Sequence, residues 1–342
     1  MSERRPEPDK VENRGLITVA VMLATIMQVL DTTIANMALP YMMGSLSASQ
    51  DQVAWVLTSY IVAAAIATPV TGWLAARMGR KRLFLASVVG FTAASILCGT
   101  AQSLGAMVIF RILQGLFGAA LVPLSQAVLL DINPPERHGR AMAIWGSGIM
   151  VAPILGPTLG GWITQNYSWR WVFYINVPVG VLAFLGILAF VRETPRDRRM
   201  GFDLFGFAAL SLAIGALQMF LDRGEQKDWF GSTEILIEAV VAALSLWVFV
   251  VHTATRKHPF LDPAMLKDRN FVASTVLMFA AGGVMYGTLV LLPPLLAMLN
   301  YPEVTAGVLM APRGIATMIT MVIVGRIIER IDIRIIVGVG LA

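Results

Sequence analysis

The chain has 342 residues, of which 57% are hydrophobic and only 14% are charged, and its formal net charge is +5. Soluble domains carry about 25% charged residues, so this composition excludes an ordinary soluble domain. The positive charge does not indicate a nucleic-acid partner, because the basic residues occupy short segments between apolar runs and form no continuous basic surface.

Ten apolar runs and the start of an eleventh follow one another along the chain, separated by short polar segments. A helix of about 20 residues crosses a hydrocarbon core of about 30 Å, so each run predicts a membrane span. The expected spans are 16–40, 53–75, 83–101, 106–130, 140–163, 171–191, 203–221, 235–252, 270–297 and 304–326, with the eleventh from Ile333. The sequence therefore predicts an all-α, polytopic transmembrane helical bundle.

Lysine and arginine are distributed unevenly between the two sides of these spans. The segments on the side of the N-terminal tail carry 21 of the 26, and those on the other side carry 3. Because short cytoplasmic segments are enriched in these residues, we expect a cytoplasmic N-terminus. The chain ends at Ala342 inside an apolar stretch, and half a span cannot satisfy its backbone in lipid. We therefore expect a fragment, or a natural truncation, of a longer protein.

The first span contains a single charged residue, Asp31. A carboxylate in mid-membrane costs about 2.5–3.5 kcal/mol even on the lenient insertion scale, so it should face a bundle interior or a wet cavity. An acid held there can bind and release a proton in step with a conformational change. The alternative is a structural aspartate that Thr32, Thr33 or Asn36 holds by hydrogen bonds at a helix seam.

The fourth span contains Arg111, about a turn from its outer end, with Gln114 at position i+3. Gly115 and Gly118 allow another helix to approach closely, so we expect these polar side chains to be buried. Asp31 is the obvious counter-charge, and such a pair could be poised to titrate as a cavity opens. The alternative is a static structural ion pair.

The fifth span has a face of small residues and two prolines. Gly148, Ala152, Gly156 and Gly160 recur every four residues, a spacing that lets a neighbouring helix come close. Pro153 and Pro157 each remove a helical hydrogen bond and allow a bend. Such a face would let two rocking bundles seal against each other, and tight packing alone would explain it equally well.

Two basic segments resemble each other within the chain. The loop after the second span contains Gly72, Arg77, Gly79, Arg80 and Lys81, and the segment after the tenth span contains Gly325, Glu329 and Arg330. Taken alone, the first is best explained as a topology signal. The repetition favours two similar halves, as transporters are often built. Eight spans separate the copies, so spans seven and eight are expected to be an inserted pair.

Four stretches, 30–40, 111–120, 156–161 and 169–178, resemble helix motifs of the major facilitator superfamily, specifically the fourteen-helix drug:proton antiporter group of the EmrB type. The resemblance implies a major facilitator fold with two extra central helices and an incomplete C-terminal half. It implies proton coupling by Asp31 and Arg111, with Thr32, Asn36 and Gln114 lining the cavity or supporting coupling. It implies an antiporter hinge formed by Gly148, Ala152, Pro153, Gly156, Pro157, Gly160 and Gly161.

The chain departs from the superfamily pattern in its cytoplasmic loops. Ala76 stands where the family's first loop motif usually carries an acid, which puts the family's cytoplasmic latch in doubt. In the second copy Glu329 stands at the acid's place and Asp332 replaces a usual glycine. The expected organisation is a tail (1–15), an N-terminal six-helix bundle (16–191), a linker with the extra pair (192–252) and the start of a C-terminal bundle (253–342).

The sequence therefore predicts a multi-pass protein of the bacterial inner membrane that exports amphipathic small molecules in exchange for protons. The alternatives are an exporter of a single physiological metabolite and a transport-incompetent fragment. The one cysteine, Cys98, and three scattered histidines offer no ligand spacing, so we expect no metal, no cofactor and no enzyme activity. The implied partners are the substrates, protons and the lipid bilayer, and EmrB-type systems also use a periplasmic adaptor protein.

Overall fold

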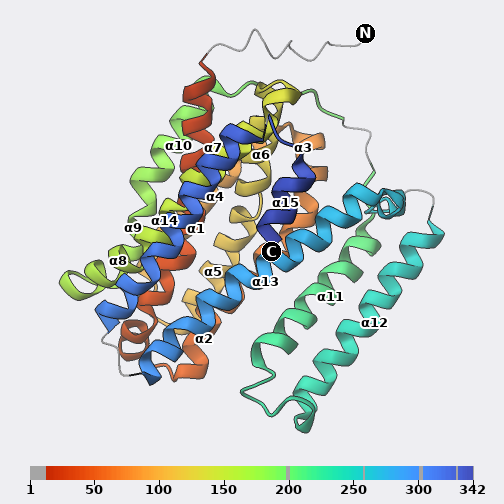
Figure 1. The fold of residues 1–342 in the computed structure, drawn as a ribbon. Helices are drawn as coiled ribbons and strands as arrows, with labels where there is room; N and C mark the ends of the chain where they lie inside the picture. The colour runs from red at the N-terminus through yellow and green to blue at the C-terminus, as the bar shows by residue number, and fades with distance from the viewer. Residues whose placement is uncertain (1–12, 198–200, 257–258, 300–302, 329, 342) are drawn as a thin grey trace. The chain divides into compact units, whose positions relative to one another are not determined.

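The computed structural model describes residues 13–197, 201–256, 259–299, 303–328 and 330–341 (Figure 1). It divides into two compact units, one formed by residues 1–200 with 313–342 and the other by residues 201–312. Over the described ranges the regular elements are α-helices and short 3-10 turns, without strands. The all-α prediction is confirmed.

The first unit contains most of the helices. They are α1 (Arg14–Leu46), α2 (Gln50–Ala67), α3 (Thr71–Met78), α4 (Arg80–Thr100), α5 (Leu104–Gly118), α6 (Leu121–Ile132), α7 (His138–Ile149), α8 (Val151–Asn166), α9 (Trp171–Tyr174), α10 (Asn176–Phe190) and α15 (Ile333–Leu341). The second unit contains α11 (Leu204–Arg223), α12 (Thr233–Thr255) and α13 (Arg269–Met298). Helix α14 (Glu303–Ile327) passes from the second unit into the first at Arg313.

Eight stretches of the described chain are long and apolar enough to cross a membrane. They are Arg14–Leu46, Gln50–Met78, Arg80–Thr100, Leu104–Ile132, Pro135–Asn166, Trp171–Phe190, Leu204–Arg223 and Thr233–Thr255. These stretches coincide, within six residues at each end, with the first eight spans that the apolar runs predict.

The fifth span is interrupted where its prolines predict a bend. Helix α7 ends at Ile149 and α8 starts at Val151. In a continuous helix the N–H of residue 153 would bond to the carbonyl of Ile149, and Pro153 has no N–H to donate. The break therefore lies one turn before Pro153, while Pro157 is accommodated inside α8.

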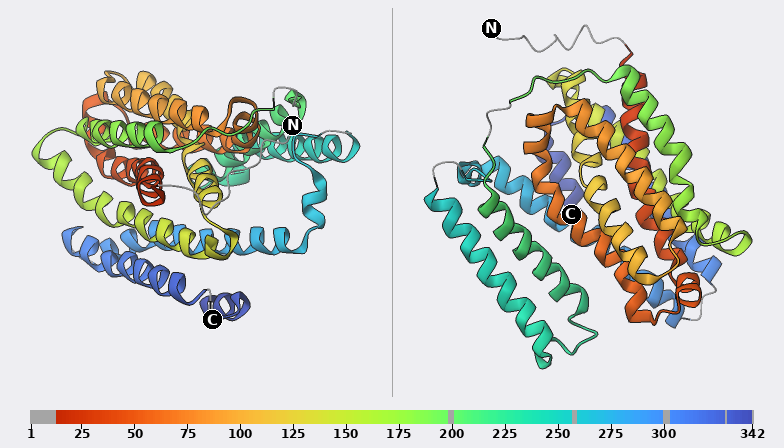
Figure 2. Two further views of the ribbon diagram at one scale, coloured as in Figure 1. Left: turned by 90° about the horizontal axis from the view of Figure 1, so that it is seen from above. Right: turned by 180° about the vertical axis from the view of Figure 1, so that it is seen from behind.

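Helix α1 lies at the centre of the first unit, packed against α8, α10 and α6 (Figures 1 and 2). Two apolar clusters follow one another along it. Val21 and Met27 belong to one, with Phe84 and Leu129, and Ile34 and its neighbours belong to the other. Asp31 falls at the transition between the clusters, so the polar site described below lies deep among apolar side chains.

In the second unit, α11 and α12 form an antiparallel hairpin fastened by Asp203 at the start of α11. One carboxylate oxygen accepts the N–H of Gly206 at 3.1 Å and the other accepts the N–H of Phe260 at 3.1 Å. His252 Nε2 lies 2.9 Å from the second oxygen. Burial raises the pKa of Asp203, but the hydrogen bonds from Gly206, His252 and Phe260 outweigh it and hold the pKa below its ordinary value.

Candidate functional site

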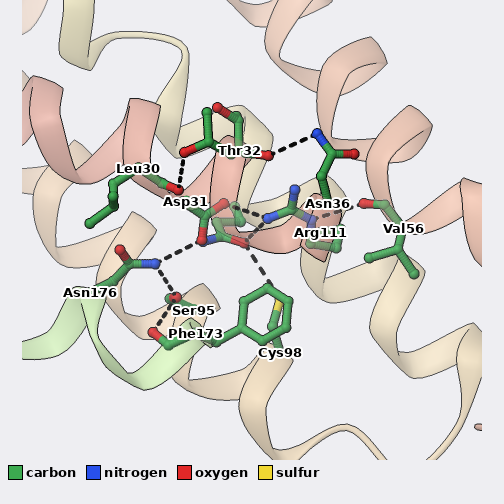
Figure 3. A network of polar contacts seen from close by, with 12 residues as sticks. Leu30, Asp31, Thr32, Asn36, Val56, Ser95, Cys98, Arg111, Phe173 and Asn176 are labelled. Atoms are coloured by element: carbon green, nitrogen blue, oxygen red, sulfur yellow. Dashed lines mark hydrogen bonds and ion pairs between the residues drawn. The ribbon is translucent and has the colours of Figure 1, made fainter. Parts of the chain in front are cut away.

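Asp31 is almost completely buried, with 1% of its surface exposed, and both of its carboxylate oxygens accept hydrogen bonds (Figure 3). Oδ2 accepts Arg111 Nη1 at 2.6 Å. Oδ1 accepts Gln114 Nε2 at 2.9 Å and Asn176 Nδ2 at 2.7 Å. The structure thus brings Asp31, Arg111 and Gln114 together as the sequence predicts, and adds a donor that the sequence analysis missed.

Arg111 lies on α5, seven residues after Leu104 and therefore about two turns inside the helix rather than one. None of its surface is exposed. Its Nε donates to the carbonyl of Val56 on α2 at 2.9 Å, and Nη1 also donates to Gln114 Oε1 at 2.7 Å. The guanidinium carbon stands 4.3 Å from the centre of the Tyr60 ring, a cation–π distance.

Asn176 begins α10 and is fully buried. Its amide nitrogen donates to Asp31 and, at 2.9 Å, to Ser95 Oγ, which in turn donates to the carbonyl of Phe173 at 2.8 Å (Figure 3). Within the described chain, Asn176 Oδ1 has no hydrogen-bond partner. In the sequence, Asn176 could have been singled out as the one amide in the apolar span 171–191, inside the stretch 169–178 that resembles the family.

The network is built for an ionised carboxylate. An ionised aspartate only accepts hydrogen bonds, and three side-chain donors from α5 and α10 converge on Asp31. The three donors occupy three of the four acceptor sites of the carboxylate, and a proton would remove the negative charge that the guanidinium of Arg111 pairs with. The protonation state of Asp31 is therefore tied physically to the contacts that α1 makes with α5 and α10.

Thr32 and Asn36 take no part in this network. The hydroxyl of Thr32 donates to the carbonyl of Val29 at 2.8 Å, and the amide of Asn36 donates to the carbonyl of Thr32 at 3.4 Å. Thr33 likewise donates to the backbone of its own helix. The alternative that these neighbours hold Asp31 at a helix seam is wrong, because its partners come from α5 and α10.

The small-residue face of α8 and the end of α7 lies against α1. A Cβ added at Gly148 would overlap Met22, and one at Gly156 would overlap Thr33. At Gly160 it would lie 3.2 Å from the carbonyl oxygen of Ile34, and Ala152 is 1% exposed. A Cβ added at Gly161 would meet open space. Close packing within the first unit accounts for these positions, and the hinge role of the motif stays a prediction.

Glycines also lie where α7 and α14 meet. A Cβ at Gly146 would lie 2.9 Å from Met321 Sδ, and a Cβ at Gly325 would lie 2.7 Å from the Cβ of Ala143. Helix α7 therefore approaches α14 through Ala143 and Gly146, which are not among the small residues that face α1.

The loop after the second span makes a sharp turn at Gly79, whose φ is +91°. Arg80 pairs with Asp131, Lys81 Nζ donates to the carbonyl of Leu188 at 2.7 Å, and Arg77 lies 5.2 Å from the Trp73 ring. Gly72 is exposed, with open space where a Cβ would be. In the second copy Gly325 is buried, the Arg330 N–H bonds to the carbonyl of Ile327 at 2.8 Å, and Glu329 lies outside the described residues.

Comparison with known proteins agrees with this picture. Multidrug export protein EmrB of Escherichia coli (strain K12) is 44% identical over 322 residues, which are 93% of this chain and 63% of EmrB. Fatty acid resistance protein FarB of Neisseria gonorrhoeae is 42% identical over 323 residues, covering 94% of this chain and 64% of FarB. The chain thus spans a little less than two thirds of the length of these curated relatives.

Among solved structures, the proton:xylose symporter XylE superposes with a TM-score of 0.60 over 93% of this chain and 69% of XylE. The sequence identity is 14%, so this likeness shows the fold alone. The family profile described as Major Facilitator Superfamily matches residues 21–342. With eight membrane-capable stretches in its described part, the chain is a multi-pass membrane protein, and it belongs to the major facilitator superfamily.

Proposed function

We propose that this chain is part of an exporter of amphipathic small molecules that exchanges them for protons by alternating access. The observation that carries the proposal is the buried carboxylate of Asp31, held between α5 and α10 by three donors. An ionisable group at membrane depth is costly and is retained where it serves ion or proton movement. The similarity to EmrB, a multidrug export protein, supports export as the direction of transport.

Coupling follows from the two protonation states of Asp31. The ionised form fastens α1 to α5 and α10, as in the described structure. The protonated form loses the ion pair with Arg111, whose guanidinium keeps Val56 and Gln114 as acceptors. We infer that α1 then moves relative to its neighbours, so that proton uptake and the rearrangement of the bundle occur together.

The proposal includes the placement of the chain in the bacterial inner membrane. The N-terminus and the loop that contains Arg80 face the cytoplasm, in agreement with the concentration of lysine and arginine on that side. Residues 16–191 form the N-terminal bundle, 192–252 a linker and an inserted helix pair, and 253–342 the start of the C-terminal bundle. A periplasmic adaptor partner is proposed from the EmrB-type resemblance alone.

A specific observation supports a second candidate. FarB, whose name states resistance to fatty acids, is nearly as similar to this chain as EmrB is. An exporter with one physiological amphipathic substrate would use the same coupling site. A growth-inhibition panel of dyes, detergents and fatty acids separates a broad exporter, which protects against several classes, from a narrow one, which protects against one.

The test of proton exchange uses liposomes that contain the purified full-length exporter of which this chain is part, and an acidic lumen reported by a pH-sensitive dye. Adding an amphipathic dye such as ethidium to wild-type liposomes is expected to release lumenal protons. Liposomes with Asp31→Asn are expected to show only the passive leak. Equal proton release from both preparations would contradict a coupling role for Asp31.

A further inference from the structure

A pocket of about 330 Å³ lies where α3, α4 and the segment after α10 meet. It is lined by Arg77, Met78, Arg82 and Arg196, so three of its four lining side chains carry a guanidinium group. Neither Asp31 nor Arg111 lines it, and the transport mechanism proposed above makes no use of it.

The chain builds this pocket by fixing the segment after α10 onto the start of α4. The N–H of Arg80 donates to Thr194 Oγ1 at 3.0 Å, and the N–H of Lys81 donates to Glu193 Oε1 at 3.1 Å. A side chain at Gly79 would overlap the carboxylate of Glu193. These contacts join residues more than a hundred positions apart, so they bring the arginines of the two segments onto one surface.

Positive charge exceeds negative charge around the pocket. Glu193 Oε2 is shared by two guanidinium groups, at 3.6 Å from Arg82 Nε and 3.8 Å from Arg196 Nη2. The segments 76–82 and 192–197 together carry six cations and only two carboxylates, Glu193 and Asp197. Even with Arg80 neutralised by Asp131, these two segments keep five cations against two carboxylates.

We propose that this pocket binds the phosphate group of an anionic ligand, supplied either by the headgroup of an anionic phospholipid or by free phosphate. Guanidinium groups match phosphate oxygens in geometry as well as charge. The flanking side chains suit a site at the membrane surface, since Met78 is 40% exposed and Trp73 lies under Arg77. Tryptophan is enriched at the interface between membrane and water. Basic pockets beside membrane helices bind anionic lipid headgroups.

The test measures ligand-dependent thermal stabilisation of the purified full chain in detergent. The probes are dioleoyl phosphatidylglycerol, dioleoyl phosphatidylcholine with the same tails, and inorganic phosphate. The pocket variant is Arg82→Gln with Arg196→Gln. The matched control is Arg137→Gln with Arg140→Gln, which removes two exposed arginines that do not line the pocket. A third variant, Arg82→Lys with Arg196→Lys, keeps the charge.

Saturable stabilisation is expected with phosphatidylglycerol and not with phosphatidylcholine. The apparent dissociation constant should rise about 30-fold in the glutamine pocket variant and stay near the wild-type value in the control. The lysine variant should bind more tightly than the glutamine variant. If the glutamine pair fails to elute as a folded protein, Arg82→Gln alone should weaken binding about fivefold.

The comparison of phosphatidylglycerol with inorganic phosphate distinguishes the source of the phosphate group. Stabilisation by phosphatidylglycerol with none by inorganic phosphate assigns the pocket to lipid, and stabilisation by inorganic phosphate that the pocket variant loses assigns it to the soluble ion. Binding that is unchanged in the pocket variants, or weakened equally in the control, overturns the proposal. Because the readout is binding, the result does not depend on whether Asp31 couples transport to protons.

Discussion

Replacing Asp31 by asparagine tests the buried ion pair and its proposed role together. The change removes the one charge that, among the described residues, forms an ion pair with the fully buried guanidinium of Arg111. Removing one partner of a buried pair costs about 3–5 kcal/mol. Arg111 keeps the Val56 carbonyl and Gln114 Oε1, so we expect a loss of stability near 3 kcal/mol, at the low end of that range. Expression should remain intact.

Two assays on Asp31→Asn separate stability from transport. Thermal unfolding in detergent should show a lower midpoint, and the double variant with Arg111→Gln should recover at least half of the loss, because no unpaired charge then remains buried. In the full-length exporter of which this chain is part, proton-driven efflux should be absent in both variants. A single variant as stable as wild type would refute the ion-pair argument. Efflux by Asp31→Asn that still collapses when the proton gradient is removed would show that another group couples.

Further predictions concern three other parts of the chain. Arg111→Ala should shift the pH dependence of transport, because the proposed coupling pair then lacks its cation, and an unchanged pH profile would leave the arginine a structural role only. Gly156→Ala should destabilise the protein by about 1–3 kcal/mol in thermal unfolding, since the added Cβ would overlap Thr33. Gly161→Ala, whose Cβ would meet open space, should be neutral or slightly stabilising. Equal effects of the two changes would contradict the close contact between α1 and α8. Asp203→Asn should cost about 1–3 kcal/mol at neutral pH. Because the pKa of Asp203 is lowered on folding, the stabilisation by its carboxylate is present above about pH 4 and is lost as the pH falls further. The difference in free energy of unfolding between Asp203→Asn and wild type should therefore narrow in acid. A difference that stays constant with pH would contradict this assignment.

The sequence predicts the helices and the central ion pair well for the same physical reason. Apolar runs of spanning length have few alternatives to helix in lipid. Charges within those runs are so rare that Asp31 and Arg111 can be paired with each other from the sequence alone. The observed contact of 2.6 Å between them agrees with that expectation.

The remaining members of the site depend on helix orientation, which composition does not show. Thr32 and Asn36 are one and five residues from Asp31, so a period of 3.6 residues turns them away from its face of α1. Asn176 reaches Asp31 only because α10 begins beside it, a tertiary relation between positions 145 residues apart. An amide in an apolar run is a weak signal compared with a charge.

The loop after the second span likewise makes contacts that its own sequence does not predict. Ala76 in place of an acid puts the family's cytoplasmic latch in doubt. In the structure the Ala76 carbonyl accepts the N–H of Asp197 at 2.9 Å, and Glu193 of the same segment brings a carboxylate to the start of α4. A carboxylate contributed from a distant segment cannot be predicted from the spacing of residues within the loop.

The most direct test of the account is an infrared pH titration of the purified chain that follows the C=O stretch of protonated carboxyl groups. Comparison of wild type with Asp31→Asn isolates the contribution of this one side chain. A carboxyl band is expected to appear on acidification in wild type and to be missing in Asp31→Asn. Identical titrations of wild type and Asp31→Asn would show that Asp31 takes up no proton, and would contradict the account.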